Sequence, residues 1–394
     1  MKKSLLALAT MGAFAGAVHA QSSVTVYGIL DLGVTNLTSD NGTTTTSTRT
    51  TAEGGAYTTQ RLGVRGTEDL GKGLRASFNF EMGLGGNGGI GNKLRAAGSE
   101  TANTATVPNT ATDQTLGDAV IRQQNLGLAG NFGSVRIGRM STLADVVIGV
   151  GDVGGGNNFL GRAYSNTSAT TGTNLINARS DRLIEYVSPT MSGLSIGVQY
   201  GTASAPTAAA ATTENGATEV GAMIRYSAGP ANLAVGYQSH KDTIVSAAQR
   251  ESTVVVVGAN YNFKVAEAFL NYQNGEVKND YGTATTASQT LPISTAAFAT
   301  AGASNKRNVS EIGVAVPMGA LRLAGSYYMG TRDNKTSETG AVTKTDLTGY
   351  QAAALYSLSK RTNLYAVYGA TKTAPAGSAA TNVADYGVGV RHTF

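Results

Sequence analysis

The sequence predicts an all-β fold, a closed antiparallel barrel of sixteen strands that crosses a membrane. Apolar residues alternate with polar or small ones through most of the chain, and the connections between these segments alternate between short and long. No stretch after residue 20 approaches the roughly 18 consecutive apolar residues of a spanning helix. Charged residues make up 14% of the 394, and 51 residues are glycine, which is unlike an ordinary soluble enzyme.

Residues 1–20 are predicted to form a secretory signal peptide that is removed on export. Lys2 and Lys3 precede a short run of small and apolar residues, and this run ends at Ala20 in a pattern that a signal peptidase reads. The mature chain, 21–394, contains no cysteine, so its stability in an oxidising compartment needs no disulfide. Because no linker divides it, we expect a single domain.

Sixteen segments of about ten residues show the alternation of a strand with one apolar face. In one of them, Leu194, Ile196 and Val198 share one parity, while Ser195 and Gly197 share the other. The segments begin near residues 24, 59, 73, 119, 133, 181, 193, 219, 231, 251, 265, 307, 320, 347, 362 and 384. With no tryptophan in the chain, tyrosines at strand ends are expected to form the aromatic girdles of the barrel: Tyr200, Tyr237, Tyr261, Tyr327 and Tyr368.

The connections predict which side of the membrane each strand end faces. Tight turns are expected at 129–133, 188–193, 227–231 and 316–320, where prolines are frequent. Eight long connections rich in Thr, Asn, Ser, Gly and Ala lie between them, and they include 36–59, 83–119, 139–181, 275–307 and 371–384. Short periplasmic turns and long extracellular loops are typical of outer-membrane barrels, which close every backbone hydrogen bond without an edge.

Several strings of residues add a family resemblance that covers the whole chain. They lie at 22–31, at 61–71, at 122–139 and at the terminal 391–394. These strings resemble the general trimeric porins of Gram-negative bacteria, most closely the β-proteobacterial branch that includes the Neisseria, Burkholderia and Comamonas types. The chain departs from the family at Asn125, where an aromatic residue is usual, and at Arg182 and Leu183, where Asn and Ser are usual.

The resemblance implies a homotrimer in the outer membrane of a Gram-negative bacterium, surrounded by membrane lipid and lipopolysaccharide. It implies that the third long loop folds into the lumen of each barrel and forms a narrow eyelet. The implied function is a water-filled channel for passive diffusion of ions and small hydrophilic solutes.

Charged residues on the lumen parity are the candidate selectivity residues, because a ring of one sign attracts ions of the other sign. Parity places the following side chains towards the lumen: Arg61, Arg65, Arg75, Arg122, Arg136, Arg179, Glu81 and Asp31. Arg122 is placed inward because Gln123 is expected to face outward. The resemblance assigns Arg61, Arg122 and Arg179 to the eyelet. The opposing acids are expected in the third loop, where Asp145 and Asp152 are the only acids between Arg139 and Asp181.

Arginines outnumber acids in this set, so we expect a weak preference for anions. No nucleic-acid partner is expected, because the formal charge is only +5 and no block of Lys or Arg runs together. The mature chain has two histidines, His240 and His392, and no cysteine, so no metal site and no cofactor are expected. Residues 193–197 match a nucleophile-elbow pattern but lie inside an alternating strand, where that motif does not work.

Three alternatives remain open on the sequence. An outer-membrane enzyme barrel would need a catalytic cluster at its outer rim. An adhesin or receptor barrel would bind a host partner or a phage through its Thr-rich loops, with the third loop plugging the lumen. A soluble β-sandwich would leave large apolar patches in water.

Overall fold

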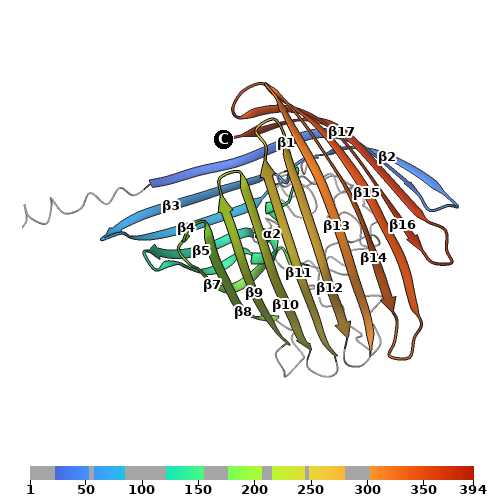
Figure 1. Cartoon of the computed structure of the whole chain (residues 1–394), viewed down its shortest axis with the longest axis horizontal. Coiled ribbons are helices and arrows are strands. Elements are labelled where there is room, and N and C mark those ends of the chain that lie inside the picture. The colour runs from blue at the N-terminus through green and yellow to red at the C-terminus, as the bar shows by residue number, and fades with distance from the viewer. Residues whose placement is uncertain are drawn as a thin grey trace, which may run out of the picture.

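A computed structural model describes residues 23–52, 57–84, 121–154, 176–205, 215–244, 248–279 and 302–394 as one antiparallel sheet (Figure 1). The predicted signal peptide and nearly all of the predicted loop 83–119 lie outside these residues. The strands are β1 (Ser23–Asp40), β2 (Thr45–Ala52), β3 (Arg61–Gly71), β4 (Leu74–Gly83), β5 (Ile121–Gly130), β6 (Gly133–Ser141), β7 (Arg179–Val187), β8 (Leu194–Ala205), β9 (Asn215–Ala228), β10 (Ala231–Ile244), β11 (Ala248–Asn262), β12 (Glu267–Asn279), β13 (Ala303–Met318), β14 (Leu321–Lys335), β15 (Val342–Ser357), β16 (Thr362–Pro375) and β17 (Thr381–Thr393). No helix in this described part is long and apolar enough to span a membrane.

The sheet closes through its first strand. On one side β1 pairs with β17, and on the other its amino-terminal part pairs with β3 and its carboxyl-terminal part with β2. The segments β2 and β3 therefore occupy one strand position, and the seventeen described segments make sixteen positions, as predicted. Every other strand pairs with its neighbours in sequence. The closed ladder satisfies the backbone of the barrel wall, which a membrane requires. Among the described strands, β2 pairs only with β1.

The predicted strand starts lie within five residues of the observed ones. Strands β4 to β7 have the predicted length of about ten residues, but most of the others are longer. Strands β9 to β17 have 13 to 16 residues and β1 has 18. The predicted loop 36–59 is wrong in its first part, because β1 and β2 form a hairpin there. Its turn is held by Asn41, whose Oδ1 accepts hydrogen bonds from the backbone N–H groups of Thr43 and Thr44 at 3.0 and 2.8 Å. The predicted loop 371–384 is likewise reduced to the turn at 376–380.

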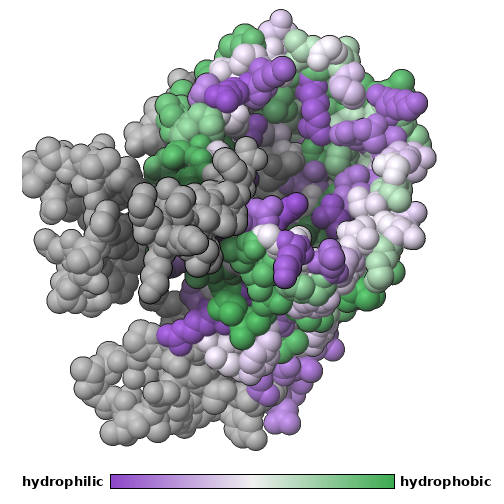
Figure 2. Space-filling model, turned by 90° about the vertical axis from the view of Figure 1, so that its left-hand side faces the viewer, coloured by the Kyte–Doolittle hydropathy of each residue, from purple (hydrophilic) through white to green (hydrophobic). Residues whose placement is uncertain are grey.

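The two faces of the wall differ as the alternation predicts. Val255 on β11 is exposed on the outer face, while its neighbours Val254 and Val256 are buried on the lumen side. All five tyrosines expected in the girdles are exposed. Figure 2 shows hydrophilic residues around a hollow in the described surface, beside hydrophobic surface on the flanks. The wall therefore presents apolar side chains to lipid and polar ones to the lumen.

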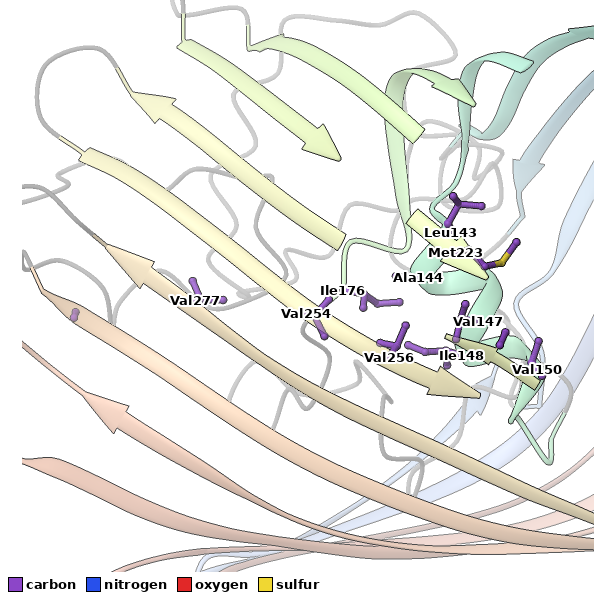
Figure 3. Packing of buried hydrophobic residues seen from close by; sticks show 12 residues of the cluster. Leu143, Ala144, Val147, Ile148, Val150, Ile176, Met223, Val254, Val256 and Val277 are labelled. Carbon is purple, nitrogen blue, oxygen red and sulfur yellow. The ribbon is translucent and has the colours of Figure 1, made fainter. Parts of the chain in front are cut away.

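The one described helix, α2 (Leu143–Val150), lies in the predicted third loop and packs against the lumen side of β8 to β11. Its apolar face contacts a cluster that includes Met223, Val254 and Val256 (Figure 3). Thr142 caps the helix by accepting a hydrogen bond from Asp145 N–H. The close fit depends on Gly258, because a Cβ at that position would lie 2.0 Å from the Val147 carbonyl oxygen. The helix thus narrows the lumen along one part of the wall.

Candidate functional site

Two arginines on the lumen side of the wall, Arg61 and Arg122, form ion pairs with one glutamate, and two more arginines are their electrostatic neighbours. We call the four the arginine cluster: Arg61, Arg122, Arg179 and Arg391. The carboxylate is that of Glu81, on β4. Arg122 Nε lies 2.6 Å from Glu81 Oε1, and Arg61 Nη1 lies 3.9 Å from the same oxygen. The hydroxyl of Tyr27 donates to the other oxygen, Glu81 Oε2, at 3.1 Å. Glu81 is buried; it is hydrogen-bonded to Arg122, and its contact with Arg61 is a longer ion pair.

The local backbone explains how Arg122 reaches the lumen. The register between β4 and β5 shifts between Glu81 and Met82, and the extra residue of β5 at that irregularity is Arg122. The expectation that Gln123 faces outward is wrong. Gln123 Oε1 accepts a hydrogen bond from the buried Asn125, and Gln123 pairs across the ladder with lumen-facing Glu81. Arg122 and Gln123 therefore both point inward, because the bulge interrupts the alternation.

The cluster carries an excess of positive charge. The strongest like-charge neighbours of Arg61 are Arg122, Arg179 and Arg391. Arg179 is influenced by Arg122 and Arg139 as like charges, and by Asp145 and Glu81 as opposite charges. Glu81 and Asp145 supply two negative charges against the four guanidinium groups. Low-dielectric walls concentrate the field of such charges.

Sequence reasoning missed two members of this site, Arg391 and Tyr27. Val388 and Val390 are exposed on the outer face, so the alternation of β17 places Arg391 on the lumen side. This alternation was the signal in the sequence that could have found Arg391. The ladder pairs Arg391 with Asp31 across the junction where the barrel closes. A contact between residues so far apart in sequence could not be inferred from one strand alone.

Three other predicted arginines face the lumen outside the cluster. The Arg65 guanidinium lies 4.9 Å from the centre of the Tyr27 ring, a cation–π contact. Arg136 Nε donates to Glu185 Oε1 at 2.7 Å, and Glu185 is buried. Arg75 is exposed and lies one residue from the end of β4 at its tight turn. Of the three, Arg65 is the one joined to Glu81 among the described residues, because it contacts Tyr27, whose hydroxyl donates to that carboxylate.

The predicted acids have different environments. Asp145, in the first turn of α2, is an electrostatic neighbour of Arg179. Asp152 is buried in the turn after α2, where its Oδ1 accepts from Gly154 N–H at 2.9 Å, and it is not among the strongest neighbours of Arg61 or Arg179. Asp145 is therefore the loop acid that the structure brings towards the arginine cluster.

Asp31 does not present its carboxylate to solutes, contrary to the sequence expectation. It is 0% exposed. Its oxygens accept hydrogen bonds from Thr58 N–H at 2.6 Å and from the Tyr365 hydroxyl at 2.6 Å. Tyr57, next to Thr58, donates to the carbonyl of Gly154 at 2.6 Å. Asp31 thus anchors the segment that contacts the third loop at Gly154.

Comparison with known proteins places this geometry in context. A family model described as Gram-negative porin matches residues 5–375. Outer membrane porin protein 32 of Delftia acidovorans is 32% identical over 291 residues, which are 72% of this chain and 72% of that protein. An outer membrane porin protein of Bordetella pertussis is 29% identical over 100% of both chains. Among solved structures, an anion-selective porin from Comamonas acidovorans has a TM-score of 0.61 and 22% identity, covering 95% of this chain and 100% of that one.

Proposed function

The chain belongs to the Gram-negative porin family, and from this premise we propose that it works as a homotrimeric channel whose arginine cluster favours small anions over cations. The protein is an outer-membrane β-barrel, and its function is that of a porin, a water-filled channel for passive diffusion of ions and small hydrophilic solutes. The sign of its selectivity, the residues that set it and the trimer are the parts that we propose.

The observation that carries the proposed selectivity is the group of four neighbouring arginines, two of which form ion pairs with the carboxylate of Glu81. A unit charge passing about 4 Å from one guanidinium interacts by about 1 kcal/mol in water and about 4 kcal/mol near a protein surface. A chloride ion at the cluster is therefore attracted, and a potassium ion is repelled. Salt screens this field over about 8 Å at physiological strength, so the preference is strongest in dilute salt.

Asp145 on α2 gives the proposed eyelet its second side. With arginines on the wall and a carboxylate on the helix, the field runs across the lumen rather than along it. A small polar solute crosses easily when its dipole aligns with this field, whereas an apolar solute must lose water without gaining such an interaction. We assign Arg65, Arg75 and Arg136 to the approaches of the eyelet, where they add to the positive potential.

The outer face supports the proposed partners. Its exposed apolar side chains need lipid or another protein surface, which membrane lipid, lipopolysaccharide and two further copies of the chain would provide. The similar porin from Comamonas acidovorans is anion-selective, which agrees with the proposed sign.

Solute permeation tests this function directly. We expect proteoliposomes containing the purified protein to swell in small sugars, and to swell faster in a small organic anion than in an organic cation of the same size. Protein-free liposomes are the control. Folded protein that admits no solute would contradict a porin function, while equal rates for anion and cation would contradict the role of the arginine cluster.

A further inference from the structure

A second pair of arginines lies directly opposite each other in the wall. The ladder between β13 and β14 pairs Arg307 with Arg332. Alternate residues of β13 are buried, including Asn305, Arg307 and Val309, so the Arg307 side chain points into the lumen. Like charges directly opposite each other destabilise a sheet. Arg307 is 4% exposed, so water does little to screen this repulsion.

Arg307 has no carboxylate partner within the described part of the chain. Its Nε donates to Asn305 Oδ1 at 3.0 Å, whereas its Nη1 is buried and has no hydrogen-bond partner there. The charge that acts on it is that of Arg332. Arg122 and Arg136 differ, because each forms an ion pair with a buried glutamate. A buried guanidinium of this kind requires a negative partner.

The neighbouring strand adds an unpartnered amide. Gln273 on β12 is 1% exposed, and neither its Nε2 nor its Oε1 has a hydrogen-bond partner among the described residues. The ladder pairs Gln273 with Val309 and Gly275 with Arg307, so Gln273 is the diagonal neighbour of Arg307 on the lumen face. Diagonal neighbours are about 7–8 Å apart, within reach of long side chains.

We propose that Arg307 and Gln273 form a binding site for a small oxyanion, for which inorganic phosphate is the representative ligand, with Arg332 adding positive charge beside it. A guanidinium group donates two parallel hydrogen bonds to an oxyanion. The amide of Gln273 donates through Nε2, and its Oε1 accepts from the protonated oxygen of hydrogen phosphate. Chloride offers no such donor. A bound oxyanion would satisfy the polar atoms that the protein leaves unpaired, which buried groups in folded proteins nearly always avoid.

This site is separate from the arginine cluster. Counted around the closed sheet, β13 is six strands from β7 and from β3, which begin with Arg179 and Arg61, and four strands from β17, which carries Arg391. The inference rests on the proposed function in one respect, which is that small anions can enter the lumen from water. Its test therefore uses binding rather than conduction.

Thermal unfolding of the detergent-purified protein measures this binding, because a ligand that binds the folded state raises the unfolding temperature. Sodium phosphate is titrated into sodium chloride at constant ionic strength. We expect phosphate to raise the midpoint of the unmodified protein, and Arg307→Gln to increase the half-maximal phosphate concentration at least tenfold. Without phosphate, Arg307→Gln should unfold no more easily than the unmodified protein, because the substitution removes the repulsion from Arg332.

Two further variants keep the test decisive. Gln273→Leu should weaken the phosphate effect even if Arg307→Gln does not fold, and Arg75→Gln, a lumen-facing arginine elsewhere, should leave it unchanged. The proposal is overturned if phosphate does not raise the unfolding midpoint of the unmodified protein. It is equally overturned if phosphate raises the midpoints of Arg307→Gln and Gln273→Leu as much as that of the unmodified protein. It is also overturned if Arg61→Gln abolishes the shift, because phosphate would then be acting at the arginine cluster. A loss of anion preference in conduction with the phosphate shift intact would contradict only the proposed selectivity.

Discussion

The double substitution Arg61→Gln with Arg122→Gln is expected to remove the anion preference of the channel or to reverse it. Both guanidinium groups interact with Glu81, so their loss leaves that carboxylate facing the lumen with Arg179 and Arg391 as the remaining positive charges. A change of 1–2 kcal/mol in the interaction with a passing ion corresponds to a factor of about 5 to 30. We expect the anion-to-cation permeability ratio, obtained from the zero-current potential in a KCl gradient, to fall at least fivefold.

Arg75→Gln is the matched control for this variant. It removes the same charge from a lumen-facing arginine, but near the tight turn and away from Glu81. We expect it to change the permeability ratio far less than the double substitution does. Folding of each variant is checked by the shift in electrophoretic mobility between unheated and boiled samples. Equal effects of the two variants would show that overall lumen charge, rather than the arginine cluster, sets the selectivity.

A single methyl group at Gly258 is expected to lower the single-channel conductance. The added Cβ in Gly258→Ala would lie 2.0 Å from the carbonyl oxygen of Val147, so α2 must move away from the wall and towards the lumen. Excess volume in a packed region costs about 1–3 kcal/mol, and here it disturbs the cluster that holds Leu143 and Ile148. Conductance steps in a planar bilayer measure the effect, and thermal unfolding should show the matching loss of stability.

Gly149→Ala provides the control, because it makes the same change on α2 itself. Gly149 is exposed, and a Cβ at this position would have no atom within 4 Å. We expect its conductance to stay close to that of the unmodified protein. A Gly258→Ala protein that folds and conducts normally would mean that α2 does not border the narrow part of the channel.

The membrane-spanning part of the fold could be predicted because lipid imposes a simple rule on it. Every second residue of a strand must be apolar where the wall meets hydrocarbon. This rule predicts the number of strands and the approximate residue at which each strand begins. Beyond the hydrocarbon both faces meet water and the alternation fades, although backbone pairing continues. The pattern therefore predicts a loop where β1 and β2 form a hairpin, since β2 consists almost entirely of Thr and Ser.

The candidate site was predictable only in part, for a related reason. The alternation of side chains along a strand correctly placed Arg61 and Glu81 on the lumen side. It failed at Gln123, because the bulge before that residue shifts the alternation by one. A second irregularity lies in β7, where Arg182 has a φ of 54°. Asp31 has the lumen phase expected of it, yet its partners Thr58 and Tyr365 come from distant parts of the chain and bury it. Such contacts depend on closure of the barrel, which local sequence does not encode.

The decisive measurement is the zero-current potential of the unmodified protein in a dilute KCl gradient. Screening is weakest in dilute salt, so the field of the arginine cluster should dominate there. We predict a potential of anion sign whose magnitude falls as the salt concentration of both compartments is raised. A potential of cation sign would contradict control by the arginine cluster and would assign control of the channel to Glu81 and Asp145.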